Sequence, residues 1–92
     1  MPTNKLNLPK MEEINSSTIE SIGWGKPGLL DTKIGLLYVC FINNSSTYEY
    51  KNVHCDLFQL LVDASKTSLS MGRLFEYLIK KHPDKYPYKK LD

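Results

Sequence analysis

The sequence predicts a single α+β domain in which a small antiparallel sheet of about three strands is followed by two helices. A length of 92 residues is enough for one hydrophobic core and too short for a second. Hydrophobic residues make up 41% and charged residues 24% of the chain, as in ordinary globular domains. Apolar residues alternate in the first half and recur at helical spacing in the second, and strands that precede helices are typical of the α+β class.

The first third of the chain contains one expected strand. Residues 1–16 are polar and show no clear period, which predicts a flexible or loosely docked arm. Residues 17–24 carry Ile19, Ile22 and Trp24 among polar neighbours, the pattern of a strand. The Gly and Pro residues of 25–32 then predict a turn or loop.

Residues 34–42 are expected to form the central strand, because β-branched and aromatic residues dominate and Asn and Ser follow at 43–46. Alternation places one apolar set on each face: Leu37, Val39 and Phe41 on one, and Leu36, Tyr38, Cys40 and Ile42 on the other. Helices can cover only one face. The second must be covered by the N-terminal arm, by another subunit or by a ligand, which makes a homo-oligomer an expectation.

A hairpin partner and two helices complete the expected fold. Residues 47–51 read as a strand with Tyr48 and Tyr50 on one face. Helical spacing of apolar residues predicts a helix over residues 54–65, followed by a linker at 66–69. Ser70 is a suitable N-cap for a second helix, which Pro83 ends because a proline disfavours helical backbone at the preceding residue.

The charge is distributed unevenly. Residues 1–65 hold five Lys and seven Asp or Glu, a net −2, whereas residues 66–92 hold seven Lys or Arg and three Asp or Glu, a net +4. An anion is therefore expected to bind near the C-terminal third. The overall net charge of +2 is smaller than a dedicated duplex-binding protein would carry.

Motifs of catalysis and cofactor binding are missing from the sequence. It contains no GxSxG, HExxH, Walker loop or GxGxxG, so we expect neither an enzyme nor a cofactor. It also has no apolar run long enough to cross a membrane and no secretory leader, which predicts a cytoplasmic protein with thiols at Cys40 and Cys55. His54 beside Cys55 lacks the spacing of a zinc site, so no metal is expected.

The start of the second helix is the best candidate for an anion site. A Ser70 cap would leave the first amides of the helix pointing outward, Gly72 would let a ligand approach the backbone, and Arg73 would add a forked donor. Lys80 and Lys81 follow on the same helix. An ordinary cap with an exposed arginine explains the same residues, and both interpretations stay open.

Aromatic residues supply the other candidate contacts. Tyr48 and Tyr50 could stack on a base and donate hydroxyl hydrogen bonds, or could be half-buried core residues. Basic and aromatic residues also interleave over residues 80–90, as in proteins that bind phosphates and bases, although a solvated tail would look the same.

These features together resemble the KTSC domain, a small family named for its occurrence at the C-terminus of some lysyl-tRNA synthetases. The resemblance covers residues 17–86 and leaves 87–92 as a basic tail. It is carried by an ordered set of residues: Ile19, Ile22, Trp24, Leu37, Val39, Phe41, Tyr48, Tyr50, Val53, Phe58, Ala64, Ser70, Gly72, Phe75, Ile79 and Lys80.

Three features depart from the family pattern: Trp24 replaces the usual Tyr, the turn at 43–47 lacks glycine, and the segment between Ala64 and Ser70 is longer. The resemblance implies a compact sheet-and-helix domain with no catalytic residue that can be carried over, and RNA binding is only a suggestion for the family.

Two functions follow as hypotheses. The first is a non-catalytic binding protein for a phosphate-bearing ligand. That ligand is either a nucleotide-like small molecule, sequestered as by phage-type antagonists of nucleotide signalling, or a single-stranded nucleic acid. Its site would comprise Ser70, Gly72, Arg73, Lys80, Lys81, Tyr48 and Tyr50. The second is a protein-interaction module that uses the other apolar sheet face or an exposed strand edge.

Overall fold

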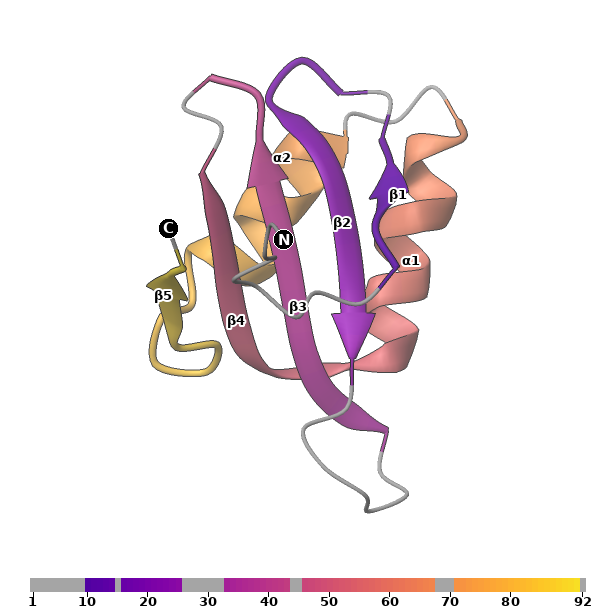
Figure 1. Ribbon diagram of the computed structural model, residues 1–92. Coiled ribbons are helices and arrows are strands. Elements are labelled where there is room, and N and C mark those ends of the chain that lie inside the picture. The colour runs from indigo at the N-terminus through magenta and orange to yellow at the C-terminus, as the bar shows by residue number, and fades with distance from the viewer. Residues whose placement is uncertain (1–9, 15, 26–32, 44–45, 68–70, 92) are drawn as a thin grey trace.

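A computed structural model describes residues 10–14, 16–25, 33–43, 46–67 and 71–91 of the chain. It contains one antiparallel sheet whose strands lie side by side in chain order, with the helices packed on one of its faces (Figure 1). The elements are β1 (Glu12–Glu13), β2 (Ile19–Gly25), β3 (Ile34–Phe41), β4 (Thr47–His54), α1 (Cys55–Ser65), α2 (Met71–Phe75), the π-helix η1 (Glu76–Lys80) and β5 (Tyr88–Lys90).

The α+β class is as predicted, but about three strands was an undercount, because the sheet has five. The three expected strands are β2, β3 and β4, and the two that were missed are its edges. β1 has two residues, both Glu, and β5 has three exposed residues, two of them Lys. Such short charged segments contain no apolar alternation, although they pair with β2 and β4. The segments 1–16 and 87–92 therefore each contribute a strand to the sheet.

The inner face of the sheet carries the core. Leu37 and Val39 have no solvent-exposed surface, and Phe41, on the same face, is half-buried, as alternation along β3 predicts. On the outer face Leu36, Tyr38 and Cys40 are half-buried, while 46% of Ile42 is exposed. The helices close the core from their side with Leu61, Val62, Phe75 and Ile79.

β4 has two irregular features near its C-terminal end, a bulge and a contact with Trp24. Asn52 has a positive φ of 64°, and the β3–β4 register shifts beside it. Gly35 lacks a side chain where the Trp24 ring crosses, since a Cβ there would stand 2.8 Å from the indole. The indole N–H of Trp24 donates a 2.8 Å hydrogen bond to the carbonyl of Val53. The Trp24 side chain therefore holds β2 close to the C-terminal end of β4.

Both helical segments lie where the sequence placed them. α1 begins after the N-cap His54, whose Nδ1 accepts a 3.0 Å hydrogen bond from the backbone N–H of Asp56. The second segment is two kinds of helix in succession, α2 and η1, and it ends before Pro83. Its expected cap, Ser70, lies outside the described residues. Within the part of the chain that is described, no helix has the length and apolarity that crossing a membrane requires.

Candidate functional site

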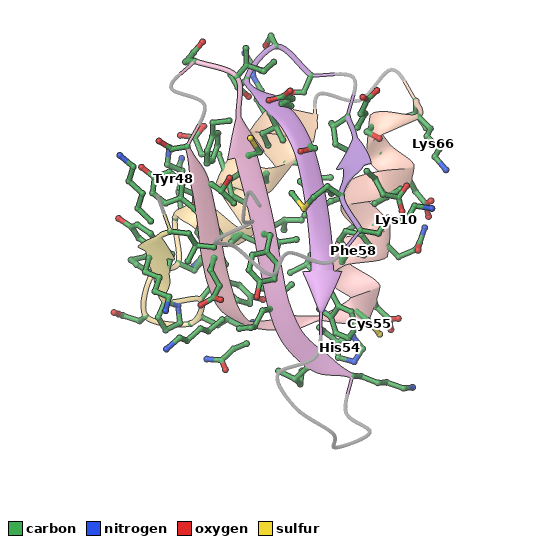
Figure 2. All side chains as sticks on the ribbon, viewed as in Figure 1. Lys10, Tyr48, His54, Cys55, Phe58 and Lys66 are labelled. Carbon is green, nitrogen blue, oxygen red and sulfur yellow. The ribbon has the colours of Figure 1, made fainter. Side chains whose placement is uncertain are left out.

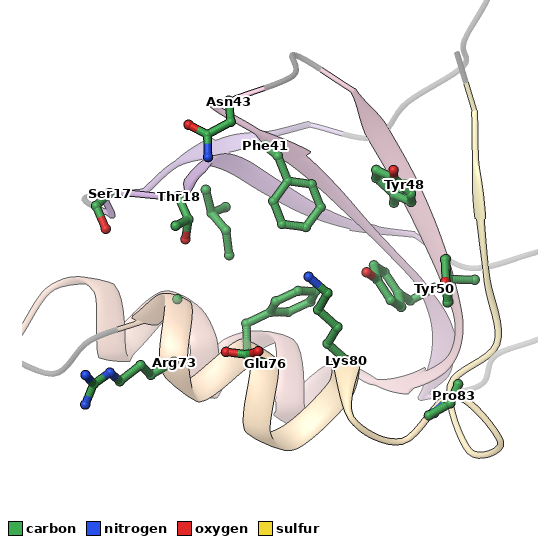
Figure 3. A pocket seen from close by; sticks show the side chains of 14 residues that line it. Ser17, Thr18, Phe41, Asn43, Tyr48, Tyr50, Arg73, Glu76, Lys80 and Pro83 are labelled. Atoms are coloured by element: carbon green, nitrogen blue, oxygen red, sulfur yellow. The ribbon is translucent and has the colours of Figure 1, made fainter.

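A pocket of about 700 Å³ opens between the inner face of the sheet and the α2–η1 segment (Figure 3). Five of the seven residues that the sequence singled out line it: Tyr48, Tyr50, Gly72, Arg73 and Lys80. Ser70 falls outside the described residues, and Lys81 is not part of the lining. The volume lies within the range of small-molecule binding sites in proteins.

One end of the pocket is aromatic. The Tyr48 ring lies 5.5 Å from that of Phe41 and 6.0 Å from that of Tyr88, and Tyr50 lies 5.4 Å from Tyr88. Phe75, which is 2% exposed, meets Tyr50 edge-on at 5.3 Å. These distances between ring centres are typical of aromatic pairs, and the faces of the rings are flat apolar surfaces. This end can accept a planar ring.

Burial makes the hydroxyl of Tyr50 harder to ionise than that of a solvated tyrosine. Tyr50 is 3% exposed, and this burial, together with the neighbouring Tyr88 and Tyr48, raises its pKa to about 12. Its hydroxyl therefore keeps its proton at neutral pH. Of the two sequence interpretations, core residue or ligand contact, Tyr50 satisfies the first and still borders the pocket, while Tyr48 is only half-buried.

The opposite end of the pocket is polar. Ser17, Thr18 and Asn43 line it, and in Figure 3 the three side chains point toward the helix. Ser16 shapes this end, because its Oγ accepts hydrogen bonds from the backbone N–H groups of Thr18 at 3.1 Å and Ile19 at 3.2 Å. These hydroxyl and amide groups can donate to an anionic oxygen.

Three charged residues line the helical side of the pocket: Arg73, Glu76 and Lys80. In Figure 3 the Lys80 side chain reaches up toward the sheet, and its Nζ lies 5.9 Å from the centre of the Phe41 ring. Arg73 is exposed and points away from the pocket. Lys80 is therefore the cation best placed to meet a ligand.

The side chains of Lys80 and Lys81, at the end of the π-helical turn, lie over different rings. The backbone N–H of Lys81 donates to the carbonyl of Glu76 at 3.0 Å, a wide turn that ends η1. The Nζ of Lys81 lies 6.0 Å from the ring of Tyr77, which is outside the pocket lining. Of the two consecutive lysines, only the first faces the pocket.

The surroundings of Gly72 suggest a second reason for a glycine at this position. A Cβ at Gly72 would stand 2.6 Å from Oγ1 of Thr18 and 3.4 Å from Oγ of Ser16. The missing side chain therefore accommodates hydroxyl groups of the same chain, and Gly72 also lines the pocket. With Arg73 turned outward and α2 only five residues long, the centre of the candidate site moves from the helix start to the pocket.

Several lining residues were not predicted as site residues. Phe41 was assigned to the core face, Tyr88 to the basic tail, and Thr18, Asn43 and Glu76 drew no attention. None belongs to a local motif, because the pocket forms only when β2, β3, β4, β5 and the helical segment meet. The interleaved aromatic and basic residues of 80–90 were the one signal that pointed toward Tyr88.

At the start of α1, the possible metal-ligand atoms of three side chains lie within 4.8 Å of one another: those of His54, Cys55 and Asp56. Figure 2 shows His54 and Cys55 together. His54 Nδ1 already accepts the backbone N–H of Asp56, and the N-terminus of a helix carries partial positive charge. Both features oppose a cation at this place, so we assign no metal to it.

No protein-family model, no curated protein and no solved structure matches this chain. The resemblance to the KTSC domain therefore stays a prediction from the sequence, and the functional argument depends on the pocket alone.

Proposed function

We propose that the protein binds a nucleotide-like, phosphate-bearing small molecule in the pocket between the sheet and α2–η1, without catalysing a reaction. The observation that carries the proposal is the division of the pocket into an aromatic end and a polar end, with a lysine between them. A nucleotide has the same division, because a planar base is joined through a sugar to an anionic phosphate.

The aromatic end suits the base. Tyr48 and Tyr88 are accessible rings close to each other, and stacking of a base on such a ring contributes about 1–3 kcal/mol. The hydroxyl and amide groups of Thr18 and Asn43 suit the phosphate, and Lys80, whose Nζ lies over the Phe41 ring between the two ends, supplies a positive charge beside it. A protein that sequesters a signalling nucleotide would need only these contacts.

Nucleic acid is the less favoured ligand. Exposed Lys89 and Lys90 on β5 could meet a phosphate chain, but a concave pocket with one inward lysine fits a single nucleotide better than a strand. A strand would bind with steeply salt-dependent affinity, whereas a ligand held by one or two cations would show a shallow dependence.

A thermal-shift screen of nucleoside mono-, di- and triphosphates, cyclic nucleotides and short oligonucleotides tests the proposal. A ligand that binds the folded state raises the melting temperature through linkage. Lys80→Ala should reduce the affinity for the stabilising nucleotide about tenfold and leave the melting temperature of the free protein nearly unchanged.

Lys81→Ala is the matched control, because it removes the same charge from the next residue, whose side chain lies outside the pocket. Equal losses in the two variants would mean that only overall charge matters and would refute a site at Lys80. Stabilisation by oligonucleotides alone would transfer the proposal to nucleic acid.

A protein-interaction module is the second candidate, favoured by the outer face of the sheet. Ile34, at the start of β3, and Ile42, just after its end, are 43% and 46% exposed, and the outer-face residues between them, Leu36, Tyr38 and Cys40, are half-buried. A second copy of the chain could cover them. Light scattering coupled to size exclusion should then show an oligomer that Ile42→Lys dissociates, and a monomer at all concentrations would exclude that arrangement.

A further inference from the structure

Among the described residues that line the pocket, Glu76 alone carries a carboxylate, and an anionic ligand gives it no obvious purpose. It lies on the helical segment between Arg73 and Lys80 and lines the pocket with them (Figure 3). A carboxylate beside a phosphate site repels the phosphate. Its contact with a ligand must therefore be to a hydrogen-bond donor.

The structure leaves this carboxylate available. A Glu four residues before a Lys on a regular helix often forms an ion pair with it. In this protein Glu76 begins the π-helical turn, and Lys80 lies over the Phe41 ring. Among the described residues, the ion pairs are formed by other side chains. Both carboxylate oxygens of Glu76 can therefore accept hydrogen bonds from a ligand.

The position of Glu76 indicates which part of a nucleotide it meets. Figure 3 places Ser17, Thr18 and Asn43 on one side of Glu76 and the Tyr48–Tyr50 end on the other. If the base occupies the aromatic end and the phosphate the polar end, the sugar lies between them, next to Glu76. A ribose presents two adjacent hydroxyl donors at its 2′ and 3′ positions, which match the two acceptors of a carboxylate.

We propose that Glu76 binds the 2′,3′-diol of a ribose and makes the pocket selective for ribonucleotides over deoxyribonucleotides. This inference rests on the proposed function and names the sugar that the same pocket takes. Acidic residues bind a ribose hydroxyl in dinucleotide-binding folds as well. The 2′-hydroxyl is also the group that distinguishes ribose from deoxyribose.

The test compares matched ligand pairs by isothermal titration calorimetry: AMP, GMP, CMP and UMP against their 2′-deoxy counterparts. The wild-type protein should bind the ribose form of its preferred nucleotide about tenfold more tightly, the lower end of the effect of a hydrogen bond to a charged group, because Glu76 is exposed. Glu76→Ala should reduce this ratio to about one. Since loss of the negative charge also changes the affinity for both forms, the ratio is the quantity that decides.

Glu13→Ala is the matched control, because it removes the same exposed carboxylate from β1, which lies outside the pocket lining, and it should keep the tenfold ratio. Equal binding of the ribose and deoxyribose forms by the wild-type protein would overturn the role of Glu76 while leaving the proposed function intact. A ratio that persists in Glu76→Ala would assign the discrimination to another residue. Failure of every nucleotide to bind would refute the proposed function, and this inference with it.

Discussion

The α1 and α2–η1 segments cover the same face of the sheet, yet the spaces beneath them differ. Under α1 the aliphatic residues Leu61, Val62 and Val53 are at most 3% exposed and fill the interior. Under α2–η1 a pocket of about 700 Å³ remains, although Phe75 and Ile79 are as deeply buried. Branched aliphatic side chains interdigitate, whereas edge-on rings and long charged side chains leave space. One half of the core serves stability, and we propose that the other serves binding.

Truncating one side chain in each half of the core tests whether the two halves differ in their contribution to stability. Leu61→Ala under α1 should lower the free energy of unfolding by about 3 kcal/mol, because it creates a cavity in a filled region. Phe41→Ala should cost less, about 1–2 kcal/mol, since its ring is half-buried and already borders open space. Urea denaturation of both variants measures the difference. A larger loss for Phe41→Ala would show that the pocket half also serves mainly as core.

The free energy of unfolding at alkaline pH tests the burial of Tyr50 in the pocket half. The folded state raises its pKa from 10 to about 12, so it favours the protonated hydroxyl more than the unfolded chain does. That stabilisation is complete below pH 10 and is lost as the pH rises from 10 through 12. The free energy of unfolding of the wild-type protein should therefore fall more steeply than that of Tyr50→Phe, by on the order of 2 kcal/mol.

Denaturant unfolding of both proteins from pH 9 to 12 checks this difference, because every other titrating group is common to the two. Parallel curves would mean that the ring is solvated in the folded protein.

Variants at the contact between Gly72 and Thr18 test the role of the glycine. Gly72→Ala places a Cβ against Oγ1 of Thr18, and Thr18→Gly removes that hydroxyl group. A double-mutant cycle on the free energy of unfolding should show a coupling of about 1 kcal/mol, since the clash disappears in the double variant. A coupling near zero, together with weaker nucleotide binding by Gly72→Ala alone, would restore the original hypothesis that a ligand approaches this backbone.

The smallest effect is expected at the edge of the sheet. The Nζ of Lys89 lies 3.8 Å from the carboxylate of Glu49, and the lysine side chain is 62% exposed. An ion pair of this kind contributes about 0–0.5 kcal/mol, so Lys89→Ala should shift the urea midpoint little. It should also leave nucleotide affinity unchanged, because Lys89 is outside the pocket lining. A large loss of affinity would favour a nucleic-acid surface on β5.

Much of the fold could be predicted from the sequence because the periods of the apolar residues are local. Alternation assigned Leu37 and Val39 to the core, and helical spacing located α1 to within a residue. The edge strands could not be predicted, because β1 and β5 depend on pairing with partners and carry no apolar pattern of their own. The bulge at Asn52 likewise depends on the register with β3.

The candidate site was predictable in its residue types more than in its geometry. Lys80, Tyr48 and Tyr50 were selected for chemistry that suits a phosphate and a base, and the fold brings them to one pocket. The same reasoning could not anticipate the contact of Gly72 with Thr18, because a missing Cβ has the same sequence signature whether it accommodates a ligand or Thr18. Glu76 drew no attention because a single acidic residue on a helix carries no pattern.

We propose that nucleotides bind in the pocket under α2–η1 and not in the packed half of the core under α1. A ¹H–¹⁵N NMR titration of the intact chain with the nucleotide that stabilises it most in the thermal-shift screen tests this, since amide shifts report which part of the fold meets the ligand. We expect saturable shifts at Phe41, Tyr48, Glu76 and Lys80, with the amides of α1 unchanged. Shifts confined to the outer sheet face or to β5, or no shifts with any nucleotide of the screen at millimolar concentration, would contradict this assignment.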